Sequence, residues 1–348
     1  MTLGAIGRVF ADDDYRFQPA CYRHTVISVV IYWAGQLGTS VSALLGVNPN
    51  YEVRGPFGRS QRREALSAGA DLVIIATTTR LADVAADVAA AVEGGSNVLV
   101  SAEEAAFPFV VDAELANRLD ALARERGVTI AGTGVNPGLL FDSLVLTMLG
   151  AAPAGCTIHV RRNVDISKFG STVLRRIGVG ATEPDFTAAV DRGEILGHAG
   201  FPQSMAIVAD AIGVQIDRID KILRPVISPV GIDIADRFYI EPGESAGVDQ
   251  TYTAMVGGKP WFVSHFFGHV DLRSLQREPS DDIDLTHKRR PFQSIKLRPG
   301  VGAQVGSSNM VANSVERVLA ARPGWLTVAE MQPAYPAPLG PRSSQRRG

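Results

Sequence analysis

The chain has 348 residues, of which 46% are hydrophobic, and this length and composition suit two domains of ordinary size. Its 34 basic and 36 acidic residues leave a formal net charge of −2. Such a balance gives no general attraction to nucleic acid or to an anionic membrane, so we expect a small-molecule partner. No apolar run approaches the roughly 20 residues that span a bilayer, and the start lacks the pattern of a signal peptide.

Cysteine and histidine usage indicates the compartment and the absence of a metal centre. The two cysteines, Cys21 and Cys156, lie far apart, which favours a reducing compartment over a disulfide framework. We therefore expect a cytoplasmic protein. Of the six histidines, only His265 and His269 have HxxxH spacing, and they lie in a predicted strand; with no CxxC either, the sequence predicts no metal site.

Residues 23–136 alternate between strand and helix patterns, as in a dinucleotide-binding domain. The alternation predicts an α/β fold with a Rossmann-type doubly wound parallel sheet. Residues 1–22 lack periodicity and are expected to form an irregular extension. A late helix with an apolar stripe suggests that residues 305–330 complete this domain. Strands are predicted at 25–32, 51–53, 71–77, 97–100 and 128–131, and helices at 39–45, 81–93, 113–126 and 309–321.

Residues 137–304 show a different pattern, which predicts a second, α+β domain for substrate binding and oligomerisation. Residues 276–290 are charged and are expected to form a solvated loop. The Pro-, Ser- and Arg-rich residues 333–348 are expected to be disordered. The pattern predicts a strand at 157–162, helices at 184–192 and 204–212, and a hairpin that joins 252–256 to 261–265 through two glycines.

A glycine-bearing turn follows the first predicted strand, where a dinucleotide fold carries GxGxxG. Gly35 and Gly38 take the places of the second and third glycines, and Gln36 and Leu37 begin a helix whose N-terminus favours a pyrophosphate. Trp33 stands where the tight-turn glycine is normally required. A nucleotide site is favoured over a purely structural turn, and the indole either blocks the pyrophosphate or displaces the backbone.

Arginines follow the second strand, in place of the carboxylate that binds the ribose hydroxyls of NAD. Arg59, with Arg54, Arg62 and Arg63 nearby, suits the 2′-phosphate of NADP. A solvated basic loop explains the same cluster equally well. The expected cofactor is therefore NADP or NAD, with NADP favoured.

Small hydroxyl residues and two carboxylates follow the third and fourth strands. Thr77, Thr78 and Thr79 would let the backbone approach a cofactor. Glu103 and Glu104 fall near the expected nicotinamide position. A carboxylate in a closed apolar site can exchange a proton with an amine or stabilise an iminium cation. The alternative is the ordinary preference for acids at the start of a helix.

The segment GTGVNPGLLFD, Gly132 to Asp142, follows the fifth predicted strand and is where we expect the active site. Its glycines and Pro137 force an irregular turn, and the Asn136 side chain has both a donor and an acceptor. In open α/β sheets, ligands bind at such strand ends. An ordinary strand-to-helix loop would also explain the glycines and the proline.

Two segments of the second domain combine polar groups with glycine and aromatic residues. One contains Asn163 and Phe169, and the other contains His198 and Phe201. A substrate contact and a structural role are equally good readings of His198. His265 and His269 are expected to have packing or cross-strand roles.

Three segments resemble the 2,4-diaminopentanoate dehydrogenases and the related NAD(P)H-dependent amine dehydrogenases, whose fold is similar to that of dihydrodipicolinate reductase. These segments are Gly132–Asp142, Asn163–Phe186 and Gly197–Ile219, within a resemblance that covers about residues 26–330. The resemblance implies reversible oxidative deamination of a small amine or diamino acid to a ketone and ammonia, with hydride passing to the nicotinamide. We expect a homodimer.

The resemblance also implies roles for particular residues. The carboxylate beside the nicotinamide falls on Glu103 or Glu104, and Glu104 is favoured. The family has WGxGxxG or a close variant where this chain has Tyr32-Trp33-Ala34-Gly35, and the connection between Val53 and Asp71 looks shorter than in the family. The implied substrate pocket comprises Asn136, Asn163, Phe169, His198 and Phe201.

Two alternatives to the amine dehydrogenase remain open. The first is an imine or carbonyl reductase that works without ammonia, since fold alone does not fix the bond that reacts. The second is a catalytically impaired member that binds a ligand without turnover. Trp33 and the short connection after the second strand motivate this second reading.

Overall fold

The computed structural model describes residues 26–67, 69–234 and 239–339, which form two compact units. Residues 144–303 make up one unit, here called the mixed-sheet unit. The described residues up to 143, together with 304–339, make up the other, here called the parallel-sheet unit. The extension predicted at residues 1–22 lies outside the described residues.

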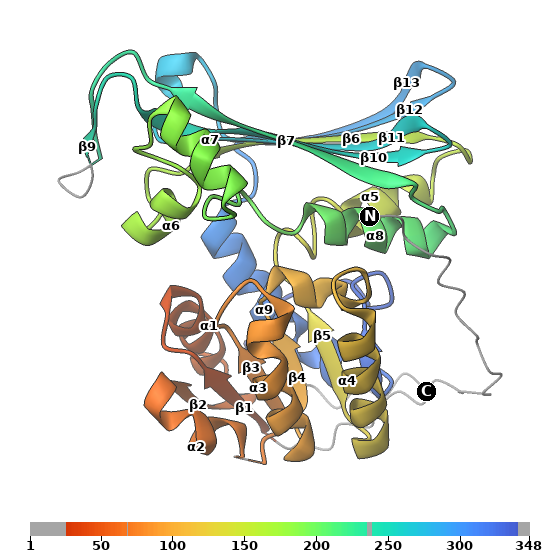
Figure 1. The fold of residues 1–348 in the computed structure, drawn as a ribbon. Helices are drawn as coiled ribbons and strands as arrows, with labels where there is room; N and C mark the ends of the chain where they lie inside the picture. Colours follow the sequence, from red (N-terminus) through yellow and green to blue (C-terminus); the bar gives the residue numbers. More distant parts are fainter. Residues whose placement is uncertain (1–25, 68, 235–238, 340–348) are drawn as a thin grey trace. The chain divides into compact units, whose positions relative to one another are not determined.

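The parallel-sheet unit is built on six parallel strands in the order β14-β5-β4-β3-β1-β2 (Figure 1). The chain runs outward from β1 to β2 and then crosses back to β3, so the predicted doubly wound sheet is confirmed. The strands are β1 Ile27–Tyr32, β2 Tyr51–Phe57, β3 Leu72–Ile75, β4 Asn97–Val100, β5 Thr129–Gly132 and β14 Gly324–Leu326. The helices are α1 Gln36–Gly46, α2 Arg62–Leu66, α3 Leu81–Glu93, α4 Ala113–Arg126 and α9 Ala303–Leu319.

Apolar side chains cover both faces of this sheet. Val30 and Val73 pack on one face with residues of α3 and α4. Ile31 and Ile74 pack on the opposite face with residues of α1 and α9. Because successive strand residues point to opposite faces, an unbroken apolar run such as Leu72–Ile75 fills both cores at once.

The mixed-sheet unit has a six-stranded sheet in the order β13-β12-β6-β11-β10-β7, in which only β6 and β11 run parallel. Its helices lie on one face of this sheet (Figure 1). The strands are β6 Thr157–Asp165, β7 Arg218–Ile227, β10 Ser245–Val256, β11 Lys259–His269, β12 Ser280–His287 and β13 Arg290–Leu297, with a separate pair β8 Ile232–Asp233 and β9 Tyr239–Ile240. The helices are α5 Ser143–Leu149, α6 Ser171–Arg176, α7 Glu183–Asp191 and α8 Phe201–Ile212.

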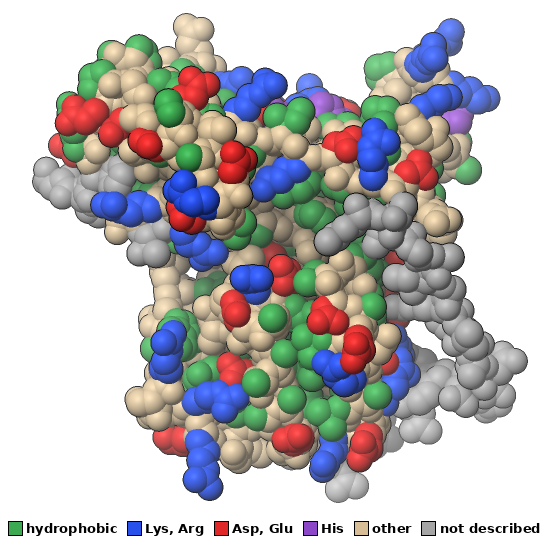
Figure 2. Space-filling model, in the orientation of Figure 1, with side chains coloured by type: hydrophobic (Ala, Val, Ile, Leu, Met, Phe, Trp, Pro, Cys, Tyr) green, Lys and Arg blue, Asp and Glu red, His purple; other side chains and the backbone are tan. Residues whose placement is uncertain are grey.

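The two glycines predicted to join a hairpin do so, with φ of 57° at Gly257 and 70° at Gly258. The solvated loop predicted at 276–290 is wrong, because β12 occupies most of it. Acidic residues hide the strand pattern, and they pair with arginines of neighbouring strands, as in Arg161–Asp284 at 2.5 Å. The predicted exposure holds at the hairpin tip, where Lys288, Arg289 and Arg290 are exposed. Basic side chains are spread over the surface of the molecule in Figure 2.

The first part of the C-terminal tail packs against the parallel-sheet unit. The Pro338 carbonyl accepts a hydrogen bond from Asn48 Nδ2 at 3.1 Å, and the Arg317 guanidinium lies 3.9 Å from the Tyr335 ring centroid. The predicted disorder therefore does not extend to residues 333–339, and residues 340–348 lie outside the described residues. Among the described helices, none has the length and apolar character needed to cross a membrane.

Candidate active site

The turn after β1 keeps the tight backbone course of a dinucleotide-binding turn although it begins with tryptophan. Trp33 adopts φ of 111°, a conformation that side-chain-bearing residues rarely take. Its backbone N–H donates to Phe57 O at 3.2 Å. A Cβ placed on Gly38 would lie 2.0 Å from Trp33 O, so this position requires glycine. The backbone is therefore not displaced by the indole, and Trp33 itself takes the strained conformation.

The indole of Trp33 lies over this turn, towards the end of β2. A Cβ on Gly35 would lie 3.0 Å from Trp33 Cδ1, so the ring covers the second glycine. Its edge meets the Tyr32 ring at a centroid distance of 6.1 Å, and the Arg59 guanidinium lies 4.9 Å from its centroid. The indole therefore links the glycine turn to the first residue of the arginine cluster.

Helix α1 begins directly after the turn, with Gly35 as its N-cap and no side chain of the described residues capping it. Its first N–H groups therefore have no side-chain acceptor, and the helix dipole favours negative charge there. This is the arrangement that binds a pyrophosphate in dinucleotide folds. Gly35, Gln36, Leu37 and Gly38 thus occupy the places that the sequence predicts.

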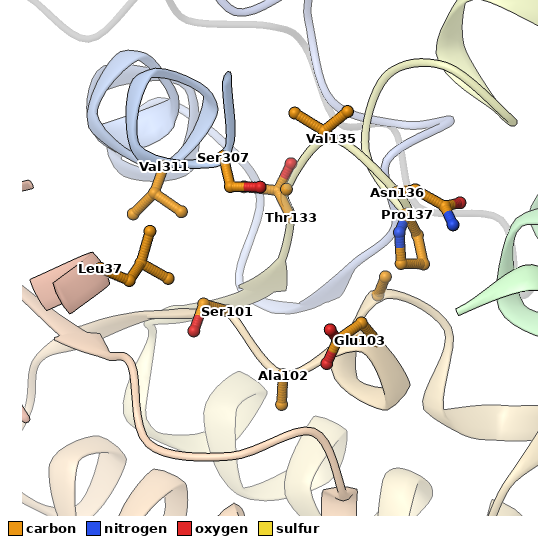
Figure 3. A pocket seen from close by; sticks show the side chains of 12 residues that line it. Leu37, Ser101, Ala102, Glu103, Thr133, Val135, Asn136, Pro137, Ser307 and Val311 are labelled. Carbon is orange, nitrogen blue, oxygen red and sulfur yellow. The ribbon is translucent and has the colours of Figure 1, made fainter. Parts of the chain in front are cut away.

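A pocket of about 110 Å³ opens at the carboxyl ends of β4 and β5, entirely within the parallel-sheet unit (Figure 3). Complete ligand sites usually exceed roughly 300 Å³, so this pocket has room for only part of a dinucleotide-sized ligand. The predicted site residues Leu37, Glu103, Asn136 and Pro137 come together here. Ser307 of α9 also lines the pocket and was not predicted, because the only pattern visible in the sequence of this helix, which is distant from β4 and β5 along the chain, is an apolar stripe. The lining residues are Leu37, Ser101, Ala102, Glu103, Ala106, Thr133, Gly134, Val135, Asn136, Pro137, Ser307 and Val311.

The two adjacent glutamates have different surroundings. Glu104 Oε2 accepts the backbone N–H of Leu81 at 2.7 Å, so this carboxylate caps the N-terminus of α3. The backbone N–H of Glu104 also donates to Thr79 O at 3.2 Å. Glu103 lines the pocket, on the side of Asn136 and Pro137 (Figure 3). The sequence favours Glu104 for the nicotinamide carboxylate, whereas the structure has Glu103 in the pocket and Glu104 at the start of α3.

Two buried hydroxyls near the strand ends have no hydrogen-bond partner among the described residues. They are Thr77 Oγ1, after β3, and Thr133 Oγ1, after β5. An unsatisfied buried hydroxyl costs about 1–3 kcal/mol, a cost that a polar ligand group within hydrogen-bond reach would remove. Thr78 differs, because its hydroxyl donates to Asp83 at 3.4 Å. The residues present at the strand ends therefore fit the polar groups of a dinucleotide.

The predicted arginine cluster divides into paired and stacked members. Arg62 Nε lies 2.5 Å from the Asp87 carboxylate, which neutralises it. Arg59 is the residue that follows Gly58 at the end of β2, and its guanidinium stacks on Trp33. Arg59 is therefore better placed than Arg62 to meet an added anion.

His198 and Phe201 form an aromatic group in the mixed-sheet unit. The His198 ring centroid lies 5.2 Å from that of Phe201 and 4.6 Å from that of Phe266. His198 Nδ1 donates to Ala199 O at 2.7 Å, which leaves Nε2 as an acceptor in the neutral ring. Gln250 accepts the His198 N–H at 2.7 Å. Burial, with a smaller contribution from Arg162, lowers the pKa of His198 to about 4, so the ring is neutral at pH 7.

Asn163 lies on the opposite face of the sheet from His198. Asn163 pairs with Phe267 in the register of β6 and β11, whereas Phe266, which contacts His198, pairs with Arg162. The Asn163 amide donates to Ser280 Oγ at 2.8 Å and accepts from Arg277 at 3.2 Å. The structure thus does not bring Asn163 together with His198 and Phe201. Phe169 is half-buried and lies in the turn that follows β6.

Arg162 lies on the same face of the mixed sheet as Phe266 and was not among the residues predicted from the sequence. Its side chain is only 2% exposed, and Nη1 lies 3.5 Å from Asp281 Oδ1. Nη2 donates to Val301 O at 2.7 Å, while Nε and Nη1 have no hydrogen-bond partner among the described residues. The period-2 alternation of β6 is the signal that would have separated Arg162 from Asn163.

A glycine turn at the start of α1, a polar pocket at the carboxyl ends of a parallel sheet and a second mixed-sheet unit define a two-domain, dinucleotide-dependent dehydrogenase. Residues 139–341 match the model of the 2,4-diaminopentanoate dehydrogenase C-terminal domain. The chain belongs to this family, as its three segments predict.

Two known proteins illustrate the relationship. The 2,4-diaminopentanoate dehydrogenase of Acetoanaerobium sticklandii is 28% identical over 331 residues, which cover 88% of this chain and 93% of the relative. The solved structure of the amine dehydrogenase from Mycobacterium smegmatis superposes with a TM-score of 0.77 at 21% identity, over 90% of this chain and 98% of that one. The predicted fold and the predicted class, an NAD(P)-dependent oxidoreductase acting on a CH–NH₂ group, are confirmed.

Proposed function

We propose that this protein catalyses the reversible oxidative deamination of a small amine or diamino acid to a ketone and ammonia, with Glu103 as the residue that handles the proton. The observation that carries this proposal is the Glu103 carboxylate in the strand-end pocket, beside Asn136 and Pro137. Family membership supports the reaction class. The capping contact of Glu104 supports the choice between the two glutamates.

The residues of the parallel-sheet unit suit a bound NAD(P). Gly35 and the N-terminus of α1 would hold the pyrophosphate, and the Thr77 and Thr133 hydroxyls would each gain a partner. When bound, this cofactor supplies the hydride acceptor. Leu37 and Val311 give the pocket an apolar side.

Glu103 would act in two stages of the deamination. Its carboxylate first accepts a proton from the substrate ammonium, which frees the nitrogen lone pair for loss of hydride from the adjacent carbon. The proton then passes from Glu103 to solvent, and the carboxylate, negatively charged again, stabilises the iminium cation that loss of hydride leaves. Water adds to the iminium carbon and ammonia leaves, which gives the ketone.

The test is ammonia-dependent oxidation of NADH and NADPH across a panel of small ketones that includes 2-amino-4-oxopentanoate. We expect turnover that requires ammonia. Turnover of the same ketone in ammonia-free buffer would instead indicate a carbonyl reductase, and no turnover with either cofactor would contradict the proposal. The homodimer and the cytoplasmic location remain predictions from the sequence.

A further inference from the structure

The geometry points to Trp33 as a positioning residue that holds Arg59 ready for the 2′-phosphate of NADP. The indole thus takes over a role in cofactor selection at a place where other dinucleotide turns have glycine. This inference rests on the proposed function for the class of cofactor. It goes further by naming which arginine binds the phosphate and which residue orients it.

Arg59 lies just past the end of β2. The ends of β1 and β2 are in register, with Tyr32 opposite Phe57, and Trp33 N–H donates to Phe57 O at 3.2 Å. In a dinucleotide fold, the residue just past the second strand faces the hydroxyls of the adenosine ribose. Arg59, separated from β2 only by Gly58, occupies that place, so its guanidinium is positioned for a phosphate on the 2′-oxygen.

Stacking on the Trp33 indole restricts the conformations of the Arg59 side chain. An exposed arginine samples many rotamers, and a guanidinium stacked on an aromatic face samples fewer. The distance of 4.9 Å from the guanidinium carbon to the indole centroid is within the range of such stacking. The indole is itself held by Tyr32 and by the close approach of Gly35. Restricting the arginine before binding reduces the entropy that binding must remove.

Arg59 differs in its surroundings from the neighbouring Arg62. Arg62 carries the same charge three residues along, yet its Nε is 2.5 Å from a carboxylate oxygen of Asp87. An anion near Arg62 would also approach that carboxylate, which offsets the attraction. Arg62→Ala is therefore a charge-matched control for Arg59→Ala.

The experiment is a calorimetric double-mutant cycle on the full chain. Dissociation constants of NADP⁺ and NAD⁺ are measured for the wild type, Trp33→Gly, Arg59→Ala and the double variant, with Trp33→Phe and Arg62→Ala as controls. We expect each single variant to weaken NADP⁺ binding about tenfold, to leave NAD⁺ within threefold, and to add nothing when combined. Trp33→Phe keeps an aromatic face and Arg62→Ala keeps the stack, so both should retain the preference. High salt should erode the preference of the wild type.

Tryptophan fluorescence gives a readout that does not depend on turnover. The chain has three tryptophans, and the other two, Trp261 and Trp325, are 8% and 1% exposed. Trp325 donates its indole N–H to Ala105 O at 3.1 Å, beside the pocket residue Ala106, so its own response to cofactor is measured in Trp33→Phe and subtracted. NADP⁺ should change the emission of the wild type and of Arg62→Ala by more than it changes that of Trp33→Phe.

The outcomes separate this inference from the proposed function. Tighter binding of both dinucleotides by Trp33→Gly would show that the indole obstructs the site, and additive losses in the cycle would show that Trp33 does not act through Arg59. Either result overturns the inference while ammonia-dependent turnover upholds the proposed function. A wild type that binds neither dinucleotide overturns both.

Discussion

The parallel-sheet unit and the mixed-sheet unit differ in how their candidate polar residues are satisfied. At the strand ends of the parallel-sheet unit, Thr77 and Thr133 have buried hydroxyls without partners among the described residues. In the mixed-sheet unit, Asn163 is bonded by Ser280 and Arg277, and Gln250 fixes the His198 backbone. A polar residue in a segment that resembles a family can therefore be assigned to ligand binding only after its hydrogen bonds to other residues of the protein have been examined.

Arg162 sharpens the comparison. Two of its buried nitrogen atoms, like the two threonine hydroxyls, lack hydrogen-bond partners among the described residues. Its charge is nevertheless balanced by Asp281 at 3.5 Å. Arg162 therefore differs in kind from the two threonines. Neutral hydroxyls at strand ends suit a ligand, and a buried ion pair holds a sheet together.

The largest effect should come from Glu103→Gln. The change removes the charge and the proton acceptor with little change in volume, so kcat should fall by about 10²–10⁴-fold while the dissociation constant of NADP⁺ stays within a factor of about three. Steady-state deamination rates and calorimetry measure the two quantities. Glu104→Gln is the matched control and should keep most of the activity, since an amide oxygen can still accept the Leu81 N–H. A larger loss for Glu104→Gln would restore the assignment that the sequence favours.

The next effect is the dependence of stability on pH through His198. Its pKa is about 4 in the folded chain against 6.5 for the free side chain, so between these values the unfolded chain binds a proton that the folded chain does not. Stability is therefore lost as pH falls through this window. The wild type should lose about 2 kcal/mol more than His198→Gln between pH 7.5 and 4.5, as measured by urea unfolding. His287→Gln, at the hairpin tip, should behave as the wild type, and equal losses in all three proteins would contradict the burial of the ring.

These two predictions also show what the sequence can and cannot predict. The doubly wound sheet is readable because parallel strands buried on both faces are continuous apolar runs, such as Leu72–Ile75. The strand β12 is not, because its aspartates are satisfied by arginines of other strands that no local window contains. The pocket is partly readable, since Asn136 and Pro137 follow a strand. Ser307 is not, because it reaches the pocket from a helix that is distant in sequence.

The sequence also does not predict which of the two adjacent glutamates lines the pocket. The sequence places both glutamates after β4. The direction of each side chain depends on the short 3₁₀ helix Glu103–Ala106, which was not predicted from the sequence. That helix aims one carboxylate at the pocket and the other at the N-terminus of α3. Adjacent residues of one type are therefore separated by local geometry rather than by composition.

A smaller effect is expected from Glu104, the glutamate at the N-terminus of α3. Glu104→Ala removes the acceptor for the Leu81 N–H at the start of α3, so the free energy of unfolding should fall by about 1 kcal/mol. Denaturant titration of the wild type, Glu104→Ala and Glu104→Gln measures this loss. Glu104→Gln should unfold at nearly the wild-type denaturant concentration, because its amide oxygen can still accept the Leu81 N–H. Equal stability of Glu104→Ala and the wild type would contradict the capping role.

The smallest effect, and the one with the least usual sign, concerns Trp33. Glycine is ordinarily less stable than alanine, because glycine loses more backbone entropy on folding. At φ of 111° the order should reverse, since alanine keeps the strain of a side chain in this conformation and glycine removes it. Trp33→Gly should therefore be more stable than Trp33→Ala by roughly 1 kcal/mol in denaturant unfolding without cofactor. Both variants lose the indole and its contact with Arg59, so the difference between them isolates the backbone. If alanine is the more stable residue here, the turn relaxes once the indole is gone, and the strain belongs to the tryptophan side chain rather than to the course of the chain.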